Sequence, residues 1–132
     1  MSIELRLLAY SVALLFVLML IQANVSVMAQ GAKPMAGNRD DLPPPKPFQD
    51  RTRRVLYNHI EAMAMFAPLV LIAAVQHISN DMTVLAVRLF FYARVLFSIV
   101  YLIGVPYLRT AVWLVGVVAT VILFLALFGL VG

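Results

Sequence analysis

Four long apolar stretches dominate the pattern of hydrophobic and polar positions along the chain. They predict helices over residues 3–28, 51–77, 83–104 and 107–131, because about 20 apolar helical residues span the hydrocarbon core of a bilayer. The first stretch follows Glu4 and Arg6 and exceeds the ~7–15 apolar residues of a signal peptide, so we expect a retained transmembrane helix. The pattern therefore predicts a single all-α integral membrane domain over residues 1–132, folded as a four-helix transmembrane bundle.

Residues 29–50 interrupt this pattern with glycines and with prolines, most of them between positions 43 and 47. Proline fixes φ and removes a hydrogen-bond donor, which predicts a loop with a stiff extended portion and no helix. Asp50 is a plausible N-cap for the second transmembrane helix. Pro68 should kink that helix, and Gly104 should end the third.

Composition supports a lipid environment. Of the 132 residues, 64% are hydrophobic and 12% are charged, and the mean hydropathy is +0.98. So few polar residues cannot cover the apolar surface of a soluble domain of this size. There is no cysteine, which excludes disulfides, thiolate metal sites and cysteine nucleophiles. No carboxylate cluster accompanies His59 or His77, so no metal site is predicted.

The net charge of +4 is interpreted as membrane topology and not as nucleic-acid affinity, because the basic residues border apolar spans. The segment from residue 29 to residue 54 holds six Lys and Arg residues, whereas the connection near residues 78–82 has none. By the positive-inside rule, the 29–50 loop is cytoplasmic and both termini are periplasmic.

A polar stripe marks the start of the second helix. Arg51, Arg54, Asn58 and Glu61 are spaced i, i+3, i+7 and i+10, which places them on one helical face. Polar groups at membrane depth are costly and usually face a bundle interior or a wet cavity. The arginines alone fit a cytoplasmic charge collar, but Asn58 and Glu61 lie beyond it. The stripe is therefore a candidate site.

A buried arginine in the third helix needs a partner. Arg94 lies ten residues before Gly104, and Glu61 lies ten residues after Arg51, so both lie about 15 Å from the same membrane surface. An ion pair would lower the cost of burying either charge. We therefore predict a structural Arg94–Glu61 pair.

Three segments resemble the MAPEG family, the membrane-associated proteins in eicosanoid and glutathione metabolism. The pattern Arg51-x-x-Arg54-x-x-x-Asn58-x-x-Glu61 resembles that family's second-helix signature. The third helix and the turn after it, from Tyr92-Ala93-Arg94-Val95 through Tyr101 to Gly104-Val105-Pro106-Tyr107-Leu108-Arg109-Thr110, are also similar. Asn38-Arg39-Asp40-Asp41-Leu42-Pro43-Pro44 resembles the loop of bacterial members.

The resemblance implies a homotrimer that holds glutathione between neighbouring subunits on the cytoplasmic side. Carried over by motif position, Thr110 would assist the thiol. The glutathione contacts would be Arg54, Asn58, Glu61, Arg94, Tyr101 and Arg109, with Arg51 on the same stripe. Arg109 and Thr110 would then stabilise the thiolate. The chain departs from the pattern at Tyr57, where active eicosanoid enzymes often have arginine, at Phe97, where some members have histidine, and at Trp113, where some have tyrosine.

The resulting hypothesis is a glutathione-binding protein of a bacterial inner membrane, a glutathione transferase or peroxidase acting on apolar electrophiles that enter from the bilayer. Two alternatives remain. One is a non-catalytic membrane protein with the MAPEG fold. The other is a small four-helix transporter, although such transporters usually carry their key carboxylate in the first helix, where this chain has only Glu4.

Overall fold

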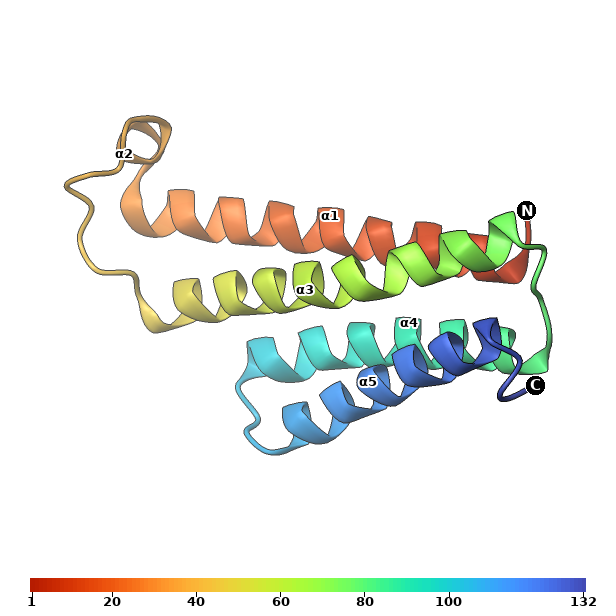
Figure 1. The fold of residues 1–132 in the computed structure, drawn as a ribbon. Coiled ribbons are helices and arrows are strands. Elements are labelled where there is room, and N and C mark those ends of the chain that lie inside the picture. Colours follow the sequence, from red (N-terminus) through yellow and green to blue (C-terminus); the bar gives the residue numbers. More distant parts are fainter.

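The fold is a bundle of long helices, seen in a computed structural model that describes all 132 residues. The helices are α1 (Ile3–Gln30), α2 (Ala32–Ala36), α3 (Pro47–Val75), α4 (Asp81–Ile103) and α5 (Leu108–Leu127). All except α2 are long and apolar enough to cross a membrane. Both termini lie at one end of the bundle, and α2 lies at the other (Figure 1). The predicted all-α bundle of four transmembrane helices is confirmed, and the chain is a multi-pass membrane protein.

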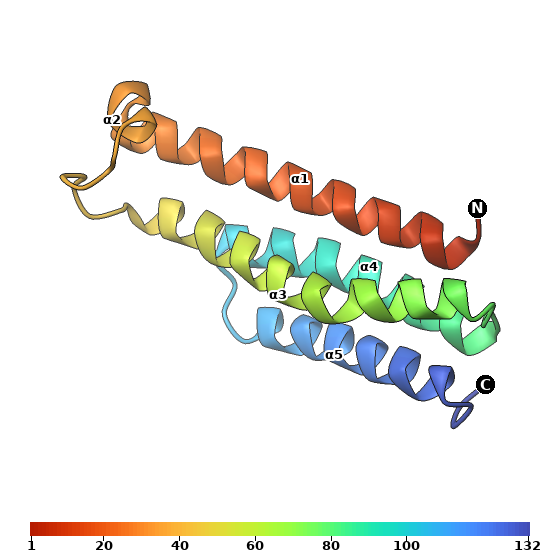
Figure 2. The same ribbon diagram turned by 45° about the horizontal axis from the view of Figure 1, so that its top comes forward.

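Helices α3 and α4 form the centre of the bundle. Each of them contacts both α1 and α5, whereas α1 and α5 do not touch and lie on opposite sides (Figure 2). The main core cluster joins all four long helices and includes Leu8, Phe66, Phe90 and Leu123. The rings of Phe66 and Phe90 stack with centroids 3.6 Å apart. Lipid tails are as apolar as these side chains, so moving the side chains out of lipid gains little free energy. Close van der Waals packing of this kind therefore holds membrane helices together.

The segment between α1 and α3 differs from the prediction. Residues 32–36 form the short helix α2, so the prediction of a loop without helix over residues 29–50 is wrong there. Pro34 is tolerated because it lies in the first turn, where backbone N–H groups lack intrahelical partners. Helix α3 begins at Pro47, four residues earlier than predicted. The Gln49 side chain accepts from the Lys46 N–H at 3.3 Å, so Asp50 lies in the first turn and is not the N-cap.

Local residue chemistry sets the other helix ends. Asn80 caps α4 by accepting from the N–H groups of Met82 and Thr83. Gly104 ends α4 in the left-handed conformation with φ +84°, as predicted. Helix α5 ends at Leu127, four residues before the predicted end, because the chain turns at Gly129 with φ +69°. Pro68 lies inside α3, which continues to Val75.

A buried carboxylate connects α1 to the α3–α4 turn at the end of the bundle that carries both termini. Glu4 at the start of α1 lies with its Oε1 2.7 Å from the hydroxyls of Ser79 and Thr83, which donate to it. These residues belong to the α3–α4 connection and the first turn of α4. Glu4 therefore fixes the start of α1 against the turn that follows α3.

Candidate functional site

Two adjoining cavities open between α3, α4 and α5, and both are lined by Asn58 and Trp113. The first has a volume of about 220 Å³, and its polar lining includes Asn58, Glu61, Arg94 and Thr120. The second, of about 200 Å³, is lined by Asn58, Phe97, Tyr101, Arg109, Thr110 and Trp113. We call the two cavities together the α3–α5 groove. It brings together most residues of the predicted site.

Arg94 is the most deeply buried charge of the groove, with 2% of its surface exposed. Its Nε donates to Nδ1 of His59 at 3.2 Å, and Nε2 of His59 lies 2.9 Å from the Ser11 carbonyl oxygen. Because arginine can only donate, Nδ1 accepts and the ring proton sits on Nε2, which donates to Ser11. His59 therefore bridges α1, α3 and α4 as a neutral ring.

The predicted Arg94–Glu61 ion pair is wrong within this chain. The only salt bridge joins Arg54 to Asp50 at 3.9 Å. The reason is helical phase: His59 is fully buried beneath Arg94, and Glu61 lies two residues further, about 200° around the helix. Glu61 still lines the first cavity with Arg94, but its side chain is exposed.

Two buried polar atoms in the groove have no hydrogen-bond partner. They are Oδ1 of Asn58, an acceptor, and Nη2 of Arg94, a donor. Both residues line the first cavity. Buried polar groups are usually paired, so an unpaired donor and an unpaired acceptor on two residues that line one cavity suit a ligand that carries both functions.

The second cavity is shaped by the start of α5. The guanidinium of Arg109 lies 4.5 Å from the centroid of the Tyr101 ring, within cation–π distance. Thr110 follows Arg109 in the first turn of α5. Because the tight turn at Gly104 joins α4 to α5, it brings Tyr101 and the Arg109–Thr110 pair to the same end of the bundle.

Two of the predicted residues line neither cavity. Arg51 packs against the end of α4, where its Nη1 would lie 2.8 Å from a Cβ added at Gly104. Arg54 points outward, with 62% of its side chain exposed, toward Asp50. The arginine part of the stripe therefore lies beyond the groove, nearer the end that carries α2.

Sequence analysis missed the role of His59. Its position follows from spacing, since it is the i+4 neighbour of both Val55 and Met63 on the buried stripe of α3. Gly116 on α5 was also missed. A Cβ there would lie 3.8 Å from Cδ of Arg94, an ordinary van der Waals distance, so the stem of Arg94 packs directly beside α5 at this residue.

Four membrane-spanning helices with a polar groove at membrane depth define a multi-pass membrane protein with a candidate small-molecule site. The MAPEG family model matches residues 7–129, so the chain belongs to the MAPEG family. This match confirms the resemblance seen in the sequence. Neither the curated proteins nor the solved structures contain a significant match to the chain.

Proposed function

We propose that the protein binds glutathione in the α3–α5 groove and transfers it to apolar electrophiles. The observation that carries the proposal is the pair of unpartnered buried atoms, Oδ1 of Asn58 and Nη2 of Arg94, on one cavity. Each cavity alone is smaller than the roughly 300 Å³ at which small-molecule sites begin. Joined through Asn58 and Trp113, they reach that size.

The charges of the groove are complementary to those of glutathione, which carries two carboxylates, an ammonium group and two amides. One carboxylate accepts from the free Nη2 of Arg94, and an amide N–H donates to Asn58. The ammonium pairs with Glu61. Charge-assisted hydrogen bonds are the strongest contacts available to such a ligand. The second carboxylate extends toward Arg51 and Arg54, beyond the groove.

A neighbouring copy of the chain completes the site in this proposal. Glu61 is exposed about 15 Å along α3 from Arg51, at membrane depth. A charged side chain facing lipid there costs at least ~2.5–3.5 kcal/mol on insertion scales. A second subunit packed over the groove removes this exposure and covers the ligand, which supports the homotrimer that the resemblance implies.

The reaction needs a thiolate. The thiol releases its proton to water, the guanidinium of Arg109 stabilises the negative sulfur, and the Thr110 hydroxyl donates a hydrogen bond to it. A cationic surrounding lowers a thiol pKa in this way. The sulfur then forms a bond to the electrophilic carbon, and the leaving group departs with its electron pair. Apolar electrophiles reach the groove laterally from the bilayer.

Calorimetry with glutathione and the detergent-purified protein tests the proposal. We expect binding that weakens more than tenfold in Arg109→Gln, because a hydrogen bond to a charged group contributes ~1.5–3 kcal/mol. The affinity should fall less in Asn58→Leu, because a hydrogen bond between neutral groups contributes ~0.5–1.5 kcal/mol. Arg88→Gln is the matched control, since Arg88 is an exposed arginine on α4 that lines neither cavity. Thr110→Val should keep the affinity and slow conjugation of an apolar aryl halide. Absence of glutathione binding would favour the non-catalytic alternative.

A further inference from the structure

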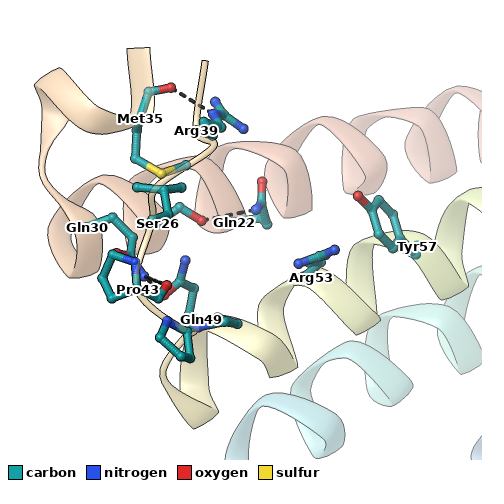
Figure 3. Close-up of a pocket in the computed structure, with 12 residues that line it drawn as sticks. Gln22, Ser26, Gln30, Met35, Arg39, Pro43, Gln49, Arg53 and Tyr57 are labelled. Atoms are coloured by element: carbon teal, nitrogen blue, oxygen red, sulfur yellow. Dashed lines mark hydrogen bonds between the residues drawn. The ribbon is translucent and has the colours of Figure 1, made fainter. Parts of the chain in front are cut away.

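A larger cavity lies at the other side of α3, separate from the α3–α5 groove. It has a volume of about 480 Å³ and is enclosed by the last turns of α1, by the proline-rich segment and by the first turns of α3 (Figure 3). Its polar lining residues are Gln22, Ser26, Gln30, Arg39, Gln49, Arg53 and Tyr57. No residue of this cavity lines the groove.

Helix lengths place this cavity at the level of the lipid headgroups. Helices α1 and α3 have 28 and 29 residues, whereas α4 and α5 have 23 and 20. At about 1.5 Å per residue, α5 matches the ~30 Å hydrocarbon core, and α1 and α3 exceed it by roughly 12 Å. The excess lies at the α2 end, where α1 and α3 extend past the other two helices (Figure 1).

The cavity carries positive charge without a carboxylate. Arg39 and Arg53 both line it, and neither forms a salt bridge, because the only salt bridge of the chain involves Arg54. Arg39 uses Nε to donate to the Met35 carbonyl oxygen at 2.8 Å, which leaves its terminal nitrogens available. The amide oxygen of Gln30 is buried without a partner, and as an acceptor it suits an ammonium group and not a phosphate. The guanidinium of Arg53 lies 5.8 Å from the centroid of the Tyr57 ring. Two guanidiniums without carboxylate partners suit a phosphate monoanion.

Two carboxylates lie beside the two arginines of this cavity. A second cavity of about 460 Å³ shares Gln30, Arg39, Leu42 and Pro43 with the first, and it is also lined by Asp40 and Asp41. The order of charges, arginines and then carboxylates, matches a phosphate followed by an ammonium group. Phosphatidylethanolamine carries these two groups in its headgroup.

An apolar path leads from the cavity along the bundle. On α1, Met19 and Phe16 lie one and two turns before Gln22, and both are exposed. On α3, Ile60 lies two turns beyond Arg53 and is also exposed. Acyl chains can lie along these side chains in the hydrocarbon layer while the headgroup occupies the cavity.

We propose that this cavity, at the α2 end between α1 and α3, binds the phosphodiester headgroup of a membrane phospholipid, with ethanolamine favoured over glycerol. This inference is independent of glutathione binding, because it uses a different face of α3. A soluble phosphate compound shares the same chemistry, so the test must separate the two sources.

The test is native mass spectrometry of the delipidated protein, titrated with phosphatidylethanolamine or with phosphatidylglycerol. We expect one tightly held phosphatidylethanolamine per chain and weaker binding of phosphatidylglycerol. The double variant Arg39→Gln/Arg53→Gln should bind at least tenfold more weakly, while the control Arg88→Gln binds like the wild type. Asp40→Asn/Asp41→Asn should lose the preference for ethanolamine. Inorganic phosphate and phosphoethanolamine should displace the lipid only at millimolar concentration.

Two results would overturn the proposal without any variant. One is that the wild type binds no phosphatidylethanolamine in the titration, and the other is that inorganic phosphate binds as tightly as the lipid. Equal lipid affinity in the wild type and the double variant would also overturn it. The Trp113 fluorescence melting curve checks folding of the double variant. Both arginines are exposed and lack salt bridges, so we expect an unchanged melting temperature.

Discussion

Removal of the His59 ring is the sharpest test of how the bundle holds its buried charge. His59 is fully buried, and its two nitrogens bond Arg94 on α4 and Ser11 on α1. His59→Leu keeps an apolar side chain in the space but removes both bonds. Arg94 would then keep two buried donors, Nε and Nη2, without partners.

The expected loss follows from these contacts. A hydrogen bond to a charged group contributes ~1.5–3 kcal/mol. The bond to Ser11 adds roughly 0.6 kcal/mol, the average measured for side-chain bonds between membrane helices. His59→Leu should therefore lower the free energy of unfolding by about 2–3.5 kcal/mol. His59→Gln should recover part of it, since an amide can accept from Arg94 and donate to Ser11.

The assay is a double-mutant cycle with Arg94→Met, measured by SDS-induced unfolding in detergent with Trp113 fluorescence. Breaking a buried polar pair is costly, whereas replacing both partners by apolar residues can be close to neutral. The double variant should thus be more stable than the sum of the two losses predicts, by ~0.5–3 kcal/mol. Strict additivity would show that His59 and Arg94 do not interact, and the bridge that His59 forms between α4 and α1 would be refuted.

Three further predictions concern the ends of the helices. Glu4→Leu should destabilise the protein by about 2 kcal/mol or more, because the Ser79 and Thr83 hydroxyls lose a charged acceptor, and Ser79→Ala should cost less in the same thermal melt. Gly104→Ala should cost only the ~1–2 kcal/mol of left-handed strain, because its Cβ would lie 2.8 Å from Nη1 of Arg51, the end of a flexible side chain that can move aside. Gly129→Ala is the control for strain alone, with nothing within 4 Å, and a much larger loss in Gly104→Ala would show that Arg51 cannot move aside. Alkaline phosphatase fused after Gly132 should be active in the periplasm, and a fusion active only in the cytoplasm would reverse the predicted topology.

The long helices could be predicted from the sequence because an apolar segment inside a membrane can adopt few stable backbone structures. Without water, every backbone group must be bonded inside the segment, so an apolar run of sufficient length becomes a helix. The segment between α1 and α3 escapes this constraint, since it lies beyond the apolar spans. Its short helix α2 and the early start of α3 depend on local contacts such as that of Gln49 with Lys46, which apolar periodicity does not reveal.

Of the polar stripe of α3, Asn58 and Glu61 line the groove, whereas Arg51 and Arg54 do not. Spacing along one helix shows which residues share a direction, and Asn58 and Glu61 do line one cavity. It does not show the rotation of the neighbouring helix, and that rotation decides which residue meets Arg94. Because α4 presents Arg94 to the inner side of α3, it meets His59, and Glu61 keeps a free carboxylate.

The arginines show why residue type alone does not define a site here. Arg94 is buried against His59, Arg51 packs on the end of α4, and Arg54 extends outward to Asp50. Arg109 lies over the Tyr101 ring at the groove. Only Arg94 and Arg109 contribute to the groove from within one chain, so Arg51 and Arg54 bind glutathione only if the ligand extends past it. Comparing the glutathione affinities of Arg54→Gln and Arg94→Gln by calorimetry tests that extension. If only Arg94→Gln loses affinity, the ligand lies within the groove and does not reach Arg54.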